Sequence, residues 1–175
     1  MKKRVNHSNF VPDYMAKSLM DVDFKALKKR GIRFIAFDAD STLVQIRGRA
    51  LSAETKAFLQ KQRSMFEGWC IASNRITNDL IPLGESMDAQ VIRATPLVRK
   101  PRRKFFDQVI RLFGGKPGEI AMIGDKLFAD IWGANRSGMV TVWVERIGPD
   151  LPWDRLFRTR SRERRILKRY VKNDR

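Results

Sequence analysis

Two aspartates one residue apart follow a short apolar run in the stretch FIAFDADSTLV, residues 34–44. Carboxylates directly behind four apolar side chains are costly to bury unless a hydrogen bond or an opposite charge compensates them. Asp38 and Asp40 could form a turn or a helix cap, where aspartate is common, or they could carry out chemistry. The choice between the two depends on which other side chains reach the same place in the fold.

Polar side chains also follow three other apolar runs. In chain order they are Ser73 and Asn74 after WCIA (69–72), Lys100 shortly after VIRA (91–94), and Asp125 and Asp130 after IAMI (120–123). Clustered carboxylates suit Mg²⁺, which binds one or two of them together with water and a substrate phosphate. Lysine binds phosphate, and a carboxylate can attack phosphorus as a nucleophile. If these groups meet, they predict metal-assisted phosphoryl transfer to an aspartate.

The elements that must position these groups alternate along the chain. We expect strands at the four apolar runs 34–37, 69–72, 91–94 and 120–123 and at VTVWV (140–144). We expect helices at 21–31 closed by Gly31, at 52–66 with Ser52 as N-cap, at 101–113 with Pro101 in its first turn, and at 126–137 ended by Gly138. Continuous apolar strands between helices predict an α/β fold with a parallel sheet covered on both faces. Ligands bind at the carboxyl edge of such a sheet, where all the polar groups above would lie.

The same residues resemble the four motifs of haloacid-dehalogenase-type (HAD) phosphatases. The matching segments are DADST (38–42), Ser73, Lys100-Pro101 and GDKLFAD (124–130). The resemblance implies a HAD-like Rossmannoid fold, with Asp38 as nucleophile and Asp40 as general acid and base. It implies that Mg²⁺ binds Asp38, the main-chain carbonyl of Asp40, Asp125 and Asp130. It places Thr42, Ser73 and Lys100 around the phosphate, and we add Asn74 as a neighbour of that site.

A narrower resemblance is to the YqeG family of compact bacterial HAD phosphatases, which are related to the mitochondrial phosphatidylglycerophosphate phosphatase. It is carried by the lead-in to FDADSTLV, by RKPRR (99–103) and by GDKLFADIWGANRSGM (124–139). Such families usually have Asn before the threonine of the first motif, where this chain has Ser41. The resemblance implies hydrolysis of phosphatidylglycerophosphate to phosphatidylglycerol.

Domain organisation follows from the spacing of the motifs. We expect a lead-in segment packed on the core (1–30), a phosphatase core (31–150) and a basic tail (151–175). Neither the interval from Asp40 to Ser73 nor the one from Ser73 to Lys100 leaves room for a folded cap domain. An uncapped cleft admits a phosphate carried by a macromolecule or a lipid headgroup.

Charge and composition indicate the kind of partner. The chain has 175 residues and a net charge of +17, which favours phosphates, nucleic acid or an anionic membrane surface. A single cysteine, Cys70, excludes an internal disulfide. No apolar run approaches the length of a transmembrane helix. We therefore expect a cytoplasmic protein, with any membrane contact peripheral to the inner membrane surface.

The basic tail leaves two interpretations open. Residues 154–175 carry ten Lys and Arg and three Asp and Glu, and four apolar residues share one helical face: Ile166, Leu167, Tyr170 and Val171. This helix could lie on an anionic bilayer, or its apolar stripe could pack on the domain.

Three functional classes remain. The first is the lipid phosphatase. The second is a phosphatase of nucleotides or nucleic-acid ends, against which the tail offers few aromatic side chains for stacking bases. The third is a non-catalytic RNA- or ribosome-binding protein on a HAD scaffold, against which both Asp38 and Asp40 are present. Lys100 could also have no role in phosphate binding, because neighbouring arginines could make it part of a solvated basic face.

Overall fold

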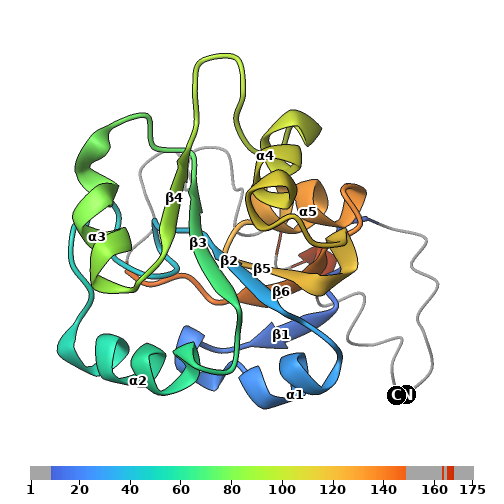
Figure 1. The fold of residues 1–175 in the computed structure, drawn as a ribbon. Coiled ribbons are helices and arrows are strands. Elements are labelled where there is room, and N and C mark those ends of the chain that lie inside the picture. Colours follow the sequence, from blue (N-terminus) through green and yellow to red (C-terminus); the bar gives the residue numbers. More distant parts are fainter. Residues whose placement is uncertain (1–8, 149–162, 164, 168–175) are drawn as a thin grey trace.

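The computed structural model describes residues 9–148, 163 and 165–167. In these residues six parallel strands form one sheet in the order β1-β6-β5-β2-β3-β4 (Figure 1). The strands are β1 (Tyr14–Ala16), β2 (Phe34–Phe37), β3 (Gly68–Ser73), β4 (Gln90–Arg93), β5 (Ile120–Gly124) and β6 (Val140–Val144). The α/β fold class with helices on both faces is confirmed.

Helical segments connect the strands. They are η1 (Leu19–Asp21), α1 (Phe24–Lys29), α2 (Ala53–Arg63), η2 (Asn78–Leu80), α3 (Ile81–Ser86), α4 (Arg103–Phe113), η3 (Pro117–Glu119), η4 (Leu127–Trp132) and α5 (Gly133–Arg136). The segment between β2 and β3 contains α2 as its only regular element, and the segment between β3 and β4 contains η2 and α3. Both segments are fully described, and neither contains a cap domain.

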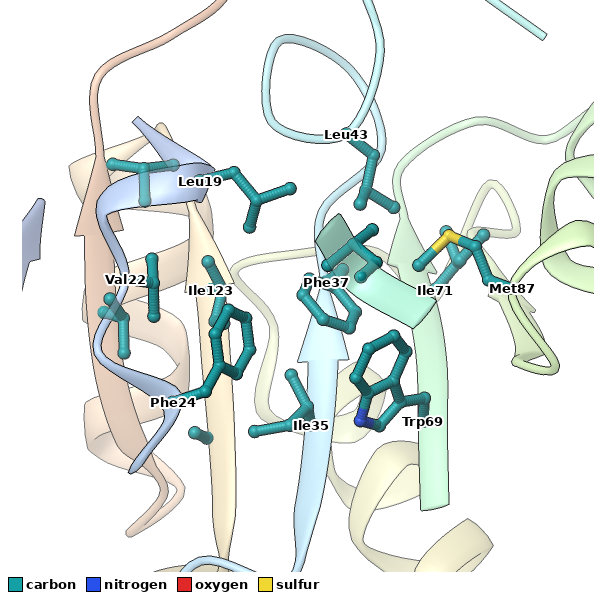
Figure 2. Close-up of a cluster of buried hydrophobic side chains, with 14 of the residues drawn as sticks. Leu19, Val22, Phe24, Ile35, Phe37, Leu43, Trp69, Ile71, Met87 and Ile123 are labelled. Carbon is teal, nitrogen blue, oxygen red and sulfur yellow. The ribbon is translucent and has the colours of Figure 1, made fainter. Parts of the chain in front are cut away.

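Alternation along the strands divides the core between the two faces of the sheet. In β2, Ile35 and Phe37 face the cluster that includes residues of α1 and α2, whereas Phe34 and Ala36 face the cluster under α4 and α5. Figure 2 shows the first cluster, in which the rings of Phe37 and Trp69 meet edge to face with centroids 5.1 Å apart. Both faces of β2 are buried, as expected for a central strand of a parallel sheet.

The residues predicted to begin or end helices are confirmed at three positions. The Oγ of Ser52 accepts a hydrogen bond from the amide of Thr55 at 3.1 Å and caps α2. Gly31 and Gly138 adopt φ values of +94° and +79° after α1 and α5, a conformation that glycine reaches without steric cost.

Three expectations differ from the structure. The lead-in contributes β1, a short edge strand beside β6 that the sequence did not indicate because it has only three residues. Helix α4 begins at Arg103, so Pro101 precedes it and does not lie in its first turn. The helix expected at 126–137 is a π-helical segment, η4, followed by α5. Such π-helical turns are frequent at functional sites.

Candidate active site

The central strands bring the first polar groups together. Strands β5, β2 and β3 are neighbours, and Phe37 lies beside Ile71 on one side and Ile123 on the other. The amide of Asp38 continues the ladder by donating to the carbonyl of Ile123 at 2.8 Å. Asp38 and Asp125 directly follow β2 and β5, and Ser73 is the last residue of β3. Because these neighbouring strands are parallel, the three residues lie at one edge of the sheet.

Lys100 is buried between two carboxylates. Its Nζ lies 2.6 Å from Oδ1 of Asp38 and 2.6 Å from Oδ1 of Asp130. Burial lowers the pKa of Lys100, but the charges of Asp130 and Asp38 outweigh this effect and raise it, so the ammonium stays protonated. Only 3% of the residue is exposed, which rules out the solvated basic face as the setting of Lys100.

Asn74 holds the main chain of Lys100 in place. Its Oδ1 accepts from the amide of Lys100 at 2.8 Å, and its Nδ2 donates to the carbonyl of Lys100 at 3.1 Å. Both polar atoms of the Asn74 side chain are therefore engaged with Lys100. This geometry favours a positioning role for Asn74 over direct contact with phosphate.

Three carboxylates form a compact acidic group. Asp38, Asp125 and Asp130 are buried, and one oxygen from each lies within 4.8 Å of the others. Burial, with the charges of Asp38 and Asp130, raises the pKa of Asp125 well above its ordinary value, although Lys126 and Arg146 oppose the shift. Oδ1 of Asp125 accepts no hydrogen bond from the described residues. A hard divalent cation that binds carboxylate oxygens fits this donor set.

The loop after β5 shapes the acidic group. Oδ2 of Asp130 accepts from the amide of Lys126 at 3.1 Å. A Cβ at Gly124 would lie 2.5 Å from the same oxygen, so only glycine lets the strand end approach Asp130 this closely. The indole Nε1 of Trp143 donates to the carbonyl of Asp125 at 2.8 Å and fixes the other end of the turn.

Asp40 is held by an arginine that the sequence reasoning missed. Nε of Arg75 donates to Oδ2 of Asp40 at 2.9 Å, and Nη2 donates to Oδ1 at 2.5 Å. Burial alone would raise the pKa of Asp40. The hydrogen bonds from Arg75 and from the amide of Arg47 have the larger, opposite effect, so the pKa of Asp40 lies below its usual value. Arg75 lies two residues after the end of β3, at the carboxyl edge of the sheet. This position could have identified it from the sequence.

Arg146 was also missed. It lies two residues beyond the end of β6, with its Nε 3.3 Å from Oδ2 of Asp125. Its guanidinium also donates to Oγ of Ser41 at 3.2 Å. Polar residues after the last expected strand were not among the candidates from the sequence.

Two hydroxyl groups complete the predicted set. Oγ of Ser73 is buried and accepts from the amide of Arg75 at 3.1 Å, so its own O–H is left to donate. Oγ1 of Thr42 is buried and has no hydrogen-bond partner among the described residues. Both hydroxyls are thus able to donate to an anion.

Part of the tail packs against the loop after β5. Residues 163 and 165–167 are helical, and Leu167 is buried in a cluster with Leu127 and Ile131. Oε1 of Glu163 accepts from the amide of Leu127 at 3.0 Å. For Ile166 and Leu167 the structure therefore supports packing on the domain. Tyr170 and Val171 lie outside the described residues.

The described helices give no sign of a transmembrane segment. None of them combines the length and the apolar character needed to cross a bilayer.

The fold is that of haloacid-dehalogenase-like hydrolases. A hydrolase of that family from Streptococcus pneumoniae matches with a TM-score of 0.52 at 13% identity, covering 65% of this chain and 84% of that chain. A protein from Listeria monocytogenes serotype 4b matches with a TM-score of 0.56 at 20% identity, covering 69% and 85% of the two chains. With the acidic group and the buried lysine at the carboxyl edge, and with phosphatases among its sequence relatives, the protein is a phosphatase of the HAD class.

The family is narrower than the class. The model of the family described as mitochondrial PGP phosphatase matches residues 2–147, and this chain belongs to that family. The Bacillus subtilis protein described as a probable phosphatase YqeG is 27% identical over 158 residues, which are 90% of each protein. The phosphatidylglycerophosphate phosphatase 1 of Arabidopsis thaliana is 25% identical over 169 residues, and the chain spans about half of that protein, 48%. The recognition made from the motifs is confirmed.

Proposed function

We propose that the protein hydrolyses a phosphomonoester through a phosphoaspartyl intermediate on Asp38, with Mg²⁺ as cofactor and phosphatidylglycerophosphate as substrate. The observation that carries the proposal is the contact of Lys100 with Asp38 and Asp130 beside the third carboxylate, Asp125. The protonated lysine donates to Oδ1 of the attacking carboxylate and can also donate to the phosphoryl oxygens.

In the first step, a carboxylate oxygen of Asp38 forms a bond to phosphorus while the bond from phosphorus to the ester oxygen breaks. Asp40 gives a proton to the departing alkoxide, which leaves as the alcohol. In the second step, Asp40 removes a proton from water, the water oxygen attacks phosphorus, and the bond to Asp38 breaks to give inorganic phosphate. Ser73, Thr42 and Lys100 donate to the phosphoryl oxygens in both steps.

The two roles of Asp40 differ in how well the structure supports them. Arg75 lowers the pKa of Asp40 and thereby favours the ionised form, which is the form that acts as base in the second step. To act as an acid the carboxyl must first bind a proton. That requires at least one of its contacts with Arg75 to weaken when the substrate enters.

Asp38, Asp125, Asp130 and the main-chain carbonyl of Asp40 would hold the metal. When bound, Mg²⁺ would supply positive charge to the transferring phosphoryl group and to the three carboxylates. Oδ1 of Asp125 accepts no hydrogen bond from the described residues and has only Lys126 Nζ at 3.9 Å, which supports this assignment, because a buried carboxylate oxygen without a hydrogen bond is costly.

The family and the lack of a cap domain in the described segments support the lipid substrate. Related proteins carry the description of phosphatidylglycerophosphate phosphatase. The segments between β2, β3 and β4 contain no cap domain that would exclude a large substrate. The net charge of +17 favours an anionic surface as the place of reaction.

The decisive experiment is phosphate release from phosphatidylglycerophosphate in anionic vesicles with Mg²⁺ and with EDTA. Asp38→Asn should reduce turnover at least a thousandfold, because it removes the nucleophile. The matched control is Asp107→Asn, a partly exposed acid on α4, which should retain wild-type activity. Turnover in Asp38→Asn would contradict the assignment of the nucleophile. Release from nucleotides or oligonucleotide ends but not from the lipid would contradict the substrate.

A further inference from the structure

We propose that the loops following β2, β3, β4 and β5 form a face that docks on an anionic lipid bilayer, with Ile76, Leu97 and Phe128 entering its surface. The proposal rests on the proposed function in that a lipid substrate gives such a face its use. It places the membrane contact at the edge of the active site. The basic tail, for which a bilayer contact was one of two open interpretations, is not part of this face.

The first observation is where the exposed large apolar side chains lie. In the described residues they are Met15, Met20, Ile76, Ile81, Leu97 and Phe128. Ile76, Leu97 and Phe128 lie in the segments directly after the carboxyl ends of β3, β4 and β5, whereas Met15 lies within β1 and Ile81 lines a pocket with Phe34 and Gly68 at the other edge of the sheet. Isolated exposed apolar residues are normal on a protein surface. Three of them on neighbouring loops at one edge of the sheet point to an interaction site.

The second observation is a regular relation to the proposed active site. Ile76 lies three residues after Ser73, Leu97 lies three residues before Lys100, and Phe128 lies three residues after Asp125. Each exposed apolar side chain therefore belongs to a loop that also carries a buried polar residue of the site. A surface that contacts these three side chains would lie against the loops that carry the site.

The third observation is that Leu97 is held in its exposed position. Figure 1 shows the loop between β4 and α4 projecting from the sheet at the top of the view. Within it, the amide of Thr95 donates to the carbonyl of Val98 at 2.9 Å, and Oγ1 of Thr95 accepts from the amide of Val98 at 3.0 Å. A guanidinium nitrogen of Arg102 donates to the carbonyl of Leu97 at 2.6 Å. With 76% of its surface exposed, Leu97 is presented by an ordered turn.

The other two apolar residues are also supported from behind. The carbonyl of Ile76 accepts from Arg93 at 3.0 Å. The ring of Phe128 stacks on that of Trp132 with centroids 4.9 Å apart.

Charge on the same loops selects the partner. Their exposed charged side chains are Arg47, Arg49, Arg99 and Arg102. The acids on these loops are buried in the site or, in the case of Asp40 and Asp79, paired with Arg75. Loops that carry both apolar side chains and arginines match an anionic bilayer, whose headgroups attract the cations while the apolar groups enter between the acyl chains.

The acidic side of the same edge does not belong to this face. The loops after β1 and β6 carry the exposed acids Asp21, Asp23 and Glu145. An anionic surface would repel these three carboxylates. Met20 lies on the β1 loop and is therefore outside the docking face.

The test compares binding of the full chain to sedimented vesicles of phosphatidylcholine with and without phosphatidylglycerol. Ile76→Ser combined with Leu97→Ser should weaken binding to the anionic vesicles at least tenfold. Met15→Ser removes an apolar side chain of similar exposure on β1 and should change binding less than twofold. All variants should keep the wild-type thermal midpoint, because the changed side chains are exposed.

Equal binding of the double variant and wild type would overturn the docking face, even if the protein hydrolyses phosphatidylglycerophosphate. Loss of binding in the double variant would support the face, even if that lipid is not hydrolysed. Tighter binding to a single-stranded RNA oligonucleotide than to anionic vesicles, unaffected by the two serines, would assign the arginines to nucleic acid and overturn the proposal.

Discussion

The guanidinium of Arg75 binds both carboxylate oxygens of Asp40, and the same side chain donates to the carbonyl of Gly48 at 2.9 Å. It also reaches Asp79 at 3.3 Å. One arginine, whose side chain is 8% exposed, thus ties the proposed acid and base to Gly48 in the loop after β2 and to η2. Its planar fork matches a carboxylate in a way that a lysine cannot.

Arg75→Met should reduce kcat/KM for an alkyl phosphate by about a hundredfold, because a misplaced acid and base loses most of its contribution. The loss should be much smaller for p-nitrophenyl phosphate, whose leaving group needs little protonation. Arg75→Lys should recover only part of the activity. Steady-state kinetics with the two substrates measures the difference.

If Arg75 acts through Asp40, its substitution should have little further effect in an Asp40→Asn background. Equal losses for both substrates, or full additivity of the two substitutions, would contradict a positioning role.

Gly124→Ala should weaken the proposed Mg²⁺ site, since the new Cβ would lie 2.5 Å from Oδ2 and 2.6 Å from Cβ of Asp130. Moving one ligand should lower the apparent affinity for Mg²⁺ by about ten- to a hundredfold. Titration of activity with Mg²⁺ and calorimetric binding measure this. The control is Gly118→Ala, whose Cβ would have no neighbour within 4 Å. Unchanged Mg²⁺ affinity in Gly124→Ala would argue against Asp130 as a ligand.

At position 41 the glycine variant should be more stable than the alanine variant, which reverses their usual order of stability. The φ of Ser41 is +69°, in the left-handed region that glycine adopts freely and alanine does not. Ser41→Gly should therefore unfold with a free energy about 1 kcal/mol higher than Ser41→Ala. Both variants lose the contact of Oγ with Arg146, so that contact does not contribute to the difference between them.

The control for this pair is the exposed helical position Lys61 in α2. There alanine should be more stable than glycine by about 1 kcal/mol. Urea denaturation measures both pairs, and the same order at both positions would rule out strain at Ser41.

Glu163 should make the stability of the protein depend on pH. Burial raises its pKa to about 7, although the hydrogen bond from the amide of Leu127 opposes the shift. The unfolded chain releases this proton near pH 4.5. Between these values the folded state binds more protons, so its stability falls as the pH rises from about 4.5 to 7.

Glu163→Gln should remove this contribution, on the order of 1–3 kcal/mol. Thermal unfolding in EDTA between pH 5 and 8 measures the difference between the variant and wild type. Parallel pH profiles for the two proteins would contradict the burial of Glu163 against Leu127.

The strands and the polar residues behind them could be read from the sequence because both depend on near neighbours. Four consecutive apolar residues such as 34–37 fit a strand buried on both faces, and a parallel sheet carries Asp38, Ser73 and Asp125 to one edge. The short edge strand β1 escaped detection, because its three residues carry too little pattern.

Contacts between distant residues were decided only in the tertiary structure. The pairing of Arg75 with Asp40 spans 35 positions, and that of Lys100 with Asp38 spans 62. The residue type of one partner does not identify the other, because any of the 36 lysines and arginines could neutralise a carboxylate. The sequence alone determined which side chains could do the chemistry. Packing determined which of them are buried together, and burial is what makes Lys100 a partner of the carboxylates instead of one more solvated cation.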